Sequence, residues 1–394
     1  MVFTRAVFVR GAGPVAWPGA RENNDVTAAT SWDRSAKSRP GPGAGWPDPP
    51  FRHLIRITDR ISLLEHTEGM EPRHQRGYCV DDAARGLVIM CREPSPRDEL
   101  ITLARRYLYF LMQAQVPDGR FYGRLGYDRR WQDEPCTRDS WGLALWGLGT
   151  AAARGPMAAI RAEALARFER GAQLRSEWPH AMAFAVLGAV EVLGVLPGHA
   201  VSLELLTAAV GVIGEPPEDP AWPWPAPRLS YANAAIAEAV IVAGWKLGDD
   251  RVLRNGLRML DWLLAGETRR GHLSVVPAGG WGNGEPRPGF DQQPIEVAAL
   301  ADACVRAAVV TGDAGWLSGV GLCVGWFLGD NDARTPMLNE HTGGGHDSLE
   351  PSGRNRNQGA QSTLAVISVL QQGRRVSAAR ASGIGRRQAA TPGA

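Results

Sequence analysis

The sequence predicts an all-α fold, an (α/α)6 toroid of six helical hairpins with long loops at one end. One unit recurs at intervals on the order of 40–65 residues, the scale of a helical-hairpin repeat. It consists of a polar loop, a helix rich in small and apolar residues, a turn and a more amphipathic helix. Period-two alternation, which indicates strands, is confined to a candidate hairpin at 272–277. Long loops repeatedly precede the first helix of a unit, which favours a closed ring over a linear solenoid of hairpins.

The chain is expected to contain one folded domain between two disordered ends. Residues 1–50 are rich in Pro, Gly, Ser and Arg and lack an apolar period. Such a segment cannot bury enough apolar surface to offset the entropy lost on ordering. Residues 373–394 have the same character. We therefore assign the toroid domain to residues 51–372.

The first helix of each unit is expected to lie in an inner ring. These helices carry Ala and Gly on several faces, as at 141–149 and 181–188, which is typical of helices buried all round. They are expected to begin near Asp82, Arg138, His180, Tyr231, Pro294 and Gln358.

The second helices are expected to form an outer ring, with Arg and Glu supplying a polar stripe toward solvent. Their predicted positions are near 97–115, 157–173, 200–213, 250–265 and 313–328. The segment 51–66 is expected to be the twelfth helix, which closes the ring.

Composition excludes several classes of function. The 43 basic and 41 acidic side chains nearly cancel, so no nucleic-acid footprint or affinity for an anionic membrane is expected. No apolar run approaches the roughly 20 residues that a membrane span needs. The five cysteines are scattered without a CxxC pair, which suits reduced thiols. Together these features predict a soluble, cytoplasmic protein.

Two adjacent carboxylates, Asp81 and Asp82, stand at the start of the first inner helix, next to Tyr78. A carboxylate at a helix N-terminus is stabilised by the macrodipole and by unpaired N–H groups, so one of the two is explained as a cap. The second acid, together with Arg85 one turn on, requires another explanation. We interpret the acid pair as catalytic, with Tyr78 and Arg85 as substrate contacts.

The loop before the second inner helix carries Trp131, Glu134, Arg138, Asp139 and Trp141. A sugar presents hydroxyl groups around a ring whose C–H face is apolar. Carboxylates and Arg match the hydroxyl groups, and Trp matches the apolar face. The alternatives are that Asp139 caps its own helix and that Trp141 packs in the core.

Two further helix entrances carry aromatic and imidazole groups. The Trp222-Pro-Trp224-Pro segment is stiff and is expected to form either a stacking platform or a rim packed on its neighbours. Tyr231 follows it, at the start of the fourth inner helix. His180 stands at the start of the third inner helix, as a substrate contact or as a satisfied core histidine.

The loop before the fifth inner helix combines Trp281 with Asp291, Gln292, Gln293 and Glu296. Capping explains Asp291 alone. Two amides beside two acids offer donors and acceptors for several sugar hydroxyl groups at once. We predict that this segment binds a saccharide, with Asp291 as a further catalytic candidate.

The last loop contains His346, Asp347 and Glu350 after a glycine triplet at 343–345. The spacing lacks the HExxH pattern and any cysteine partner, so no metal and no other cofactor is expected. The Lys and Ser or Thr of a phosphate loop are also missing after the glycines. A flexible rim that carries hydrogen-bonding groups over a cleft is the favoured interpretation.

With these residues in place, the chain resembles six-hairpin, (α/α)6-toroid carbohydrate-active proteins. The Gly-Tyr-Cys-Val-Asp-Asp segment at 77–82 is similar to the Asp-pair segments of unsaturated glucuronyl hydrolases. A closer resemblance covers most of 51–372 and is to helical modules found alone or fused to bacterial glycosyltransferases. It is carried by residues 53–59, 77–82, 291–296 and 346–347. In those modules Asn-Ala-Arg tends to follow the acid pair, whereas this chain has Ala-Ala-Arg.

These features favour a glycoside hydrolase that uses two carboxylates as general acid and base on an oligosaccharide or glycoconjugate. One acid is expected from Asp81 or Asp82, and the other from Asp139, Glu134 or Asp291. One alternative is a non-catalytic helical module that binds a glycan or a partner glycosyltransferase. The other is a sugar epimerase of the same barrel class, with His180 as its base. The sequence shows no nucleotide-sugar Rossmann domain.

Overall fold

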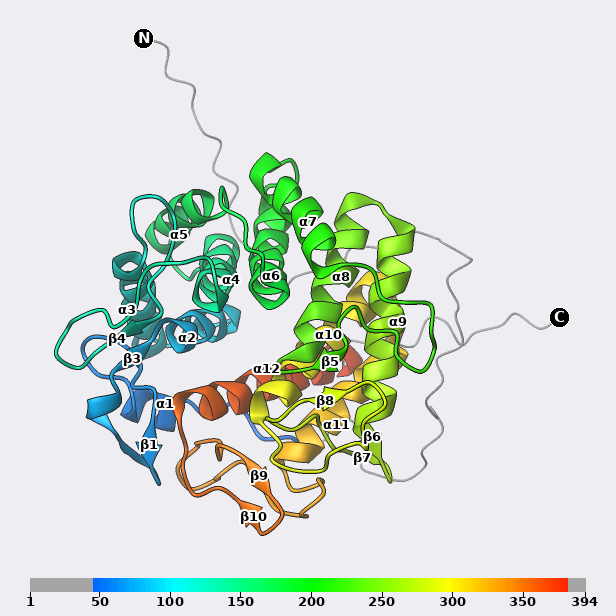
Figure 1. Cartoon of the computed structure of the whole chain (residues 1–394). Coiled ribbons are helices and arrows are strands. Elements are labelled where there is room, and N and C mark those ends of the chain that lie inside the picture. Colours follow the sequence, from blue (N-terminus) through cyan, green and yellow to red (C-terminus); the bar gives the residue numbers. More distant parts are fainter. Residues whose placement is uncertain (1–44, 382–394) are drawn as a thin grey trace.

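The computed structural model describes residues 45–381, which form two concentric rings of helices (Figure 1). Disorder is expected for residues 1–50 and 373–394, and most of these two segments, 1–44 and 382–394, lies outside the described residues. The inner ring consists of α2 (Val80–Arg92), α4 (Asp139–Arg154), α6 (Pro179–Val195), α8 (Asn233–Leu247), α10 (Pro294–Thr311) and α12 (Ala360–Ala381). The outer ring contains α3 (Asp98–Ala114), α5 (Ala158–Gly171), α7 (Ala200–Ile213), α9 (Asp250–Glu267) and α11 (Leu317–Phe327).

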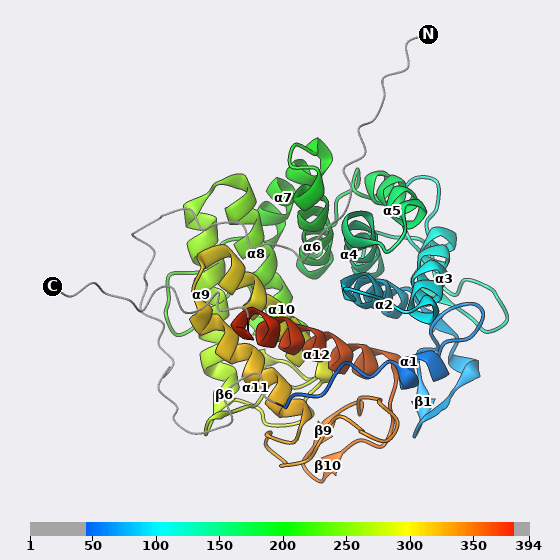
Figure 2. The ribbon, with the colours of Figure 1, turned by 180° about the vertical axis from the view of Figure 1, so that it is seen from behind.

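The inner ring is closed. Each inner helix contacts the next one along the chain, and α12 packs against both α10 and α2. Seen from behind in Figure 2, α12 spans the gap between the first and last parts of the fold. The predicted (α/α)6 toroid is therefore confirmed, and the open row of hairpins is excluded. None of the described helices is both long and apolar enough to cross a bilayer.

The twelfth helix is where the structure departs from the sequence prediction. Within 51–66 only α1 (Arg52–Arg56) is helical, and it packs against α12. The side chain of Asp59 accepts hydrogen bonds from the backbone N–H groups of Ile61 and Ser62. These local bonds offer the backbone an alternative to the helix. The chain then turns inward, which places Glu65 near the entrance of α2. At the other end, α12 continues past the predicted boundary at residue 372.

Short two-stranded pairs connect the loops at one end of the ring. Three are local hairpins: β1 (Thr67–Glu68) with β2 (Glu71–Pro72), β6 (Thr268–Arg269) with β7 (His272–Leu273), and β9 (Leu349–Glu350) with β10 (Gly353–Arg354). Two join distant segments: β3 (Tyr78–Cys79) with β4 (Arg124–Leu125), and β5 (Arg228–Leu229) with β8 (Trp281–Gly282). The hairpin expected at 272–277 therefore lies slightly earlier, at β6–β7.

Close helix packing explains the many small residues of the inner ring. Where α4 meets α6, a Cβ at Gly142 would lie 2.2 Å from the carbonyl oxygen of Ala181. A Cβ at Gly188 would lie 2.1 Å from the carbonyl oxygen of Leu145. Only glycine allows two backbones to approach this closely.

A buried charge network fills the lumen of the ring toward the C-terminal ends of the inner helices. Arg306 on α10 lies 3.1 Å from Glu191 on α6 and 3.2 Å from Glu238 on α8. Arg154 on α4 lies 2.6 Å from Glu191. The two arginines hold the pKa of Glu191 well below its usual range, against the effect of burial.

A second set of contacts, also involving α10, includes the remaining two inner helices. Arg92 on α2 lies 2.9 Å from Asp302 on α10 and donates to Ser368 on α12. Gln372 on α12 donates to the other oxygen of Asp302 at 2.5 Å. Both sets include a side chain of α10, so all six inner helices contribute a charged or polar side chain to them, and we call the two sets together the lumen network.

Gly188→Ala tests the helix contact. The added methyl group has no room against the backbone of α4. The free energy of unfolding should therefore fall by roughly 1–3 kcal/mol, the usual cost of overpacking. Gly194→Ala on the same helix is the matched control, because nothing lies within 4 Å of a Cβ there. It should leave stability unchanged or raise it by up to about 1 kcal/mol. Urea unfolding of both variants measures the difference, and equal stabilities would contradict the packing described.

Arg306→Met tests the lumen network. It leaves Glu191 and Glu238 without a shared cation, and removing one partner of a buried pair costs about 3–5 kcal/mol. Arg251→Met is the control, because Arg251 pairs with Glu215 at 2.7 Å with both side chains exposed. Loss of such a surface pair costs at most about 1 kcal/mol. If urea unfolding gives the same cost for both variants, the lumen network does not stabilise the ring.

Candidate active site at the mouth of the ring

The loops that precede the inner helices gather at one end of the ring, which we call the mouth. Besides the strand pairs, an antiparallel bridge joins Gln292 to Leu349, which brings the loops before α10 and α12 together. A second bridge joins Leu64 to Tyr78. The clustering of loops that the sequence predicts is therefore present.

Groups at the entrances of four inner helices form a connected cluster at the mouth, which we call the acid cluster. The hydroxyl group of Ser140 donates to Asp81 at 2.6 Å. The hydroxyl group of Tyr231 donates to Asp139. The His180 ring stacks on Tyr231 with centroids 4.3 Å apart. Neither acid forms a side-chain cap at the start of its own helix, so capping does not explain them.

His180 is present in a defined tautomer. Its Nε2 lies 2.7 Å from the backbone oxygen of Tyr231. A carbonyl oxygen only accepts, so Nε2 carries the proton and Nδ1 has a lone pair. Burial lowers the pKa of His180, against the opposing effect of Asp139, and thus favours the neutral ring. The cluster therefore offers a neutral imidazole base beside a carboxylate.

Burial raises the pKa of both members of the acid pair. Asp82 lies behind Asp81, is only 4% exposed, and approaches Arg85 at 3.5 Å. Burial raises the pKa of Asp82 to about 7, although Arg85 acts in the other direction. Burial also raises the pKa of the half-buried Asp81, opposed by Arg85 and by the hydrogen bond from Ser140. Asp82 is therefore able to hold a proton near neutral pH, and the same desolvation favours the protonated form of Asp81.

Three potential metal ligands lie beside the acid pair but do not suit a cation. Ligand atoms of Glu65, Cys79 and Asp82 lie within 4.8 Å of one another. Arg124 already contacts both oxygens of Glu65, and Arg85 faces Asp82. Burial raises the pKa of the Cys79 thiol well above its usual value, so it stays protonated. The charge that a metal would supply is present as two guanidinium groups.

The lumen below the mouth is too small for a sugar. Its cavity of about 50 Å³ is lined by residues of the inner helices, among them Arg85, Trp146, Phe184 and Glu238. A water molecule occupies about 30 Å³ in the liquid, whereas ligand pockets usually measure 300–1,000 Å³ by rough survey. The lumen therefore has no room for a ligand the size of a saccharide.

Several residues predicted to bind substrate are core residues in the structure, which corrects those assignments. Tyr78 and Trp141 are fully enclosed, and their polar atoms bond to Asp59 and to the Gly171 backbone, respectively. Gln292 is equally enclosed. It donates to Asp332 and accepts from Trp326.

Trp222 and Trp224 form a packed rim rather than an exposed platform. Both are almost fully buried, and both pack against Trp262, with ring centroids 5.1 and 6.2 Å away. Trp281 is half-buried and stacks on the same Trp262. Trp131 is likewise half-buried, stacked on Tyr122 with centroids 4.9 Å apart. These indoles stabilise the loops of the mouth.

Other predicted contacts brace one loop against the next helix. Glu296 accepts hydrogen bonds from the backbone and side chain of Asn233, and so caps α8 from α10. Asp347 accepts from Gly359 and Ser362, and so caps α12. Burial raises the pKa of Glu296 to about 7 in spite of its three donors.

His346 and Glu350 also act within the protein. The buried His346 donates from Nδ1 to the backbone oxygen of Asn355, and Glu350 accepts from the side chain of Asn355. Gln293 is half-buried and immediately precedes α10. Among the described residues, no side-chain hydrogen bond or ion pair joins the exposed Glu134 or the exposed Asp291 to the acid cluster. The role of these two as partners of the acid pair stays a prediction.

Sequence reasoning missed two features of the mouth. Trp178, directly before α6, is 45% exposed, and the guanidinium of Arg138 lies 5.1 Å from its ring centroid. The sequence position of Trp178 could have identified it, because Trp178 directly precedes an inner helix, as several of the other candidates do. The second feature is Glu65, whose carboxylate lies close to that of Asp82. The sequence predicts that Glu65 is part of an outer helix, and no local pattern indicates this contact.

Comparisons with known proteins agree with this fold. No protein-family model and no curated protein matches the chain in sequence. Among solved structures, it is similar to a sugar epimerase from a ruminal bacterium (TM-score 0.61, 13% identity, 81% of this chain and 94% of that one). It is also similar to the cellobiose 2-epimerase from Bacillus thermoamylovorans (0.61, 10%, 83% and 95%). A GH76 α-mannanase from Bacteroides thetaiotaomicron is similar over 77% of this chain and 88% of its own (0.55, 9%). The chain thus has the (α/α)6 toroid fold of these carbohydrate-active enzymes.

Asp82→Asn should change how stability depends on pH. The pKa of Asp82 is about 7 in the folded chain, above its value of about 3.9 in an unfolded one. The stability associated with the protonated carboxyl is fully present below about pH 4 and is lost as pH rises through 7. The variant lacks this loss, so its stability relative to the wild type should rise between pH 4 and 8, by at most about 4 kcal/mol. Urea unfolding at both pH values measures it, and a constant difference would contradict a buried, protonated Asp82.

Proposed function

We propose that this chain is a carbohydrate-active enzyme, a glycoside hydrolase that acts at the mouth of the ring. The observation that carries the proposal is the placement of Asp81 and Asp139. They come from neighbouring inner helices, both are half-buried, and both are joined to the same hydrogen-bonded cluster through Ser140 and Tyr231. Hydrolysis of a glycosidic bond requires two carboxyl groups close to each other, and Asp139 is near enough to Asp81 to raise its pKa.

The two acids have different surroundings, which suggests different roles. Burial raises the pKa of Asp81, which favours its protonated form, and we assign it the role of general acid. It protonates the glycosidic oxygen as the bond to the anomeric carbon breaks. Asp139 is oriented by the Tyr231 hydroxyl group and is the acceptor that takes a proton from the attacking water, or attacks the anomeric carbon itself. Ser140 links the two groups in sequence and in space.

The sugar rings would lie against the exposed aromatic side chains of the mouth. Trp178 and Tyr231 are both at least one-third exposed and flank His180. Flat apolar faces of this kind match the C–H face of a pyranose, while Arg138 and Arg85 supply donors to its hydroxyl groups. The names of the structural neighbours, which include epimerases and a mannanase, support a carbohydrate substrate.

Asp81→Asn and Asp139→Asn test the catalytic pair. Each should lower turnover by about 100- to 10,000-fold, the usual contribution of a general acid or base. Release of reducing ends is measured on a panel of α- and β-linked oligosaccharides, with and without phosphate. Asp250→Asn, an exposed acid in the first turn of α9, is the control and should keep full activity.

The outcomes of this assay separate the classes of function. Full activity in both active-site variants would remove the pair from the mechanism. Products that form only with phosphate would indicate a phosphorylase. Saccharide binding by the wild type without any turnover would indicate a glycan-binding module, such as one that accompanies a glycosyltransferase.

Epimerisation is the second candidate, and His180 is the observation that favours it. Its Nδ1 lone pair is that of a neutral imidazole, next to Asp139 and Tyr231. Such a base removes a proton from the carbon beside a sugar carbonyl. In heavy water an epimerase would place deuterium on that carbon without forming new reducing ends. His180→Asn would abolish this exchange, whereas a hydrolase would show none.

A further inference from the structure

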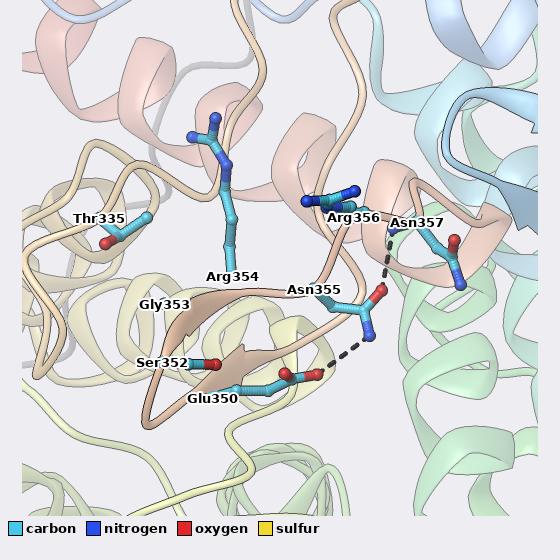
Figure 3. Close-up of a pocket in the computed structure, with 8 residues that line it drawn as sticks. All are labelled: Thr335, Glu350, Ser352, Gly353, Arg354, Asn355, Arg356 and Asn357. Atoms are coloured by element: carbon cyan, nitrogen blue, oxygen red, sulfur yellow. Dashed lines mark hydrogen bonds between the residues drawn. The ribbon is translucent and has the colours of Figure 1, made fainter.

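A polar pocket of about 790 Å³ lies on the loop that precedes α12, along β9–β10 (Figure 3). Its lining consists of Thr335, Glu350, Ser352, Gly353, Arg354, Asn355, Arg356 and Asn357. None of these residues has a large apolar side chain. Its size suits a mono- or disaccharide, since small-molecule sites measure roughly 300–1,000 Å³. The pocket is separate from the acid cluster.

The two arginines of the pocket lack carboxylate partners. Arg354 donates to the backbone oxygen of Pro336, a neutral acceptor. Arg356 has no hydrogen bond or ion pair with any residue between 45 and 381. The pocket's one carboxylate, Glu350, is occupied by Asn355 and Ser348. Figure 3 shows the two arginine side chains on one side of the strand and Glu350 with Asn355 on the other.

The backbone beneath the arginines is held in place. His346 donates to the Asn355 backbone oxygen at 2.8 Å, from a buried position. The Asn355 side chain accepts from the Asn357 backbone at 2.9 Å. Asn357 in turn accepts from the backbone of Gly69 in the β1–β2 hairpin at 3.0 Å. A fixed backbone lowers the entropy lost when a ligand binds.

The pocket is linked to the surroundings of the acid cluster. Asn357 is followed by the first turn of α12, where the Ala360 N–H donates to the backbone oxygen of Glu65 at 3.0 Å. The side chain of Glu65 is the carboxylate beside Asp82. The loop that lines the pocket is therefore tied through the start of α12 to the segment that positions Glu65.

We propose that this pocket binds the acidic group of a saccharide, a carboxylate or a phosphate ester, through Arg354 and Arg356. Guanidinium groups match the planar oxygens of both anions, and the Asn and Ser side chains match sugar hydroxyl groups. The claim that this sugar is part of the substrate rests on the proposed function. The claim that the pocket binds an acidic sugar does not depend on it.

The test measures binding by calorimetry to the full chain, with D-glucuronate, D-glucose 6-phosphate, D-glucose and inorganic phosphate as probes. Both acidic sugars should bind at least about tenfold more tightly than glucose, and more weakly as salt is added. Arg354→Gln and Arg356→Gln should each weaken the affinity for both acidic sugars by about tenfold or more. Arg105→Gln, the same change at an exposed position on α3, should have no effect.

Three results would overturn the proposal. These are equal binding of glucose and the acidic sugars, unchanged binding in both pocket variants, and inorganic phosphate binding as tightly as glucose 6-phosphate. The last would mean a site for free anions. Asp81→Asn keeps the two inferences apart, because it should retain glucuronate binding while losing turnover. If it stays active instead, the catalytic assignment fails and the binding result still stands.

Discussion

The lumen network is the constraint on which the rest of this structure depends. A ring of six helices encloses a central space that side chains have to fill, and here charged groups fill its deeper part. Arg306 bridges Glu191 and Glu238, and Arg92 and Gln372 share Asp302. A charge buried alone is very unfavourable, so each helix must keep its partner. The network thereby fixes which helices are neighbours and how far along its axis each one lies.

That fixed ring explains why the mouth is able to hold acids close together. Asp81 and Asp139 reach the same space because α2 and α4 are neighbours in the ring, although 57 other residues separate them in the chain. The packed helix ends also shield the carboxyl groups from water, and this desolvation raises the pKa of Asp81 and of Asp82. The arginine beside them limits that rise. Position and proton affinity therefore have the same origin, in the closure of the ring.

The sequence predicted the ring but only part of the site. Helix starts near Arg138, His180 and Pro294 could be predicted because small residues, helix-entry residues and helical periodicity are local signals. The helix expected over 51–66 ends at Arg56, and the local bonds of Asp59 just beyond it favour a turn that the sequence pattern does not indicate. The indole of Trp141 bonds to the backbone of Gly171 at the end of α5, a contact 30 residues away that no local pattern records. The sequence therefore identified the loops of the mouth more reliably than the orientation of each side chain.

The acids of the mouth show why residue type and position at a helix start do not by themselves identify function. Glu296 and Asp347 are both near helix entrances, and each caps a helix with its carboxylate: Glu296 caps the neighbouring α8, and Asp347 caps α12. Asp81 and Asp139 occupy the first turns of their own helices, yet they accept from Ser140 and Tyr231 side chains instead of backbone N–H groups. A carboxylate that already satisfies backbone donors is committed to structure. One that is held only by hydroxyl groups at an accessible surface remains able to exchange a proton with a ligand.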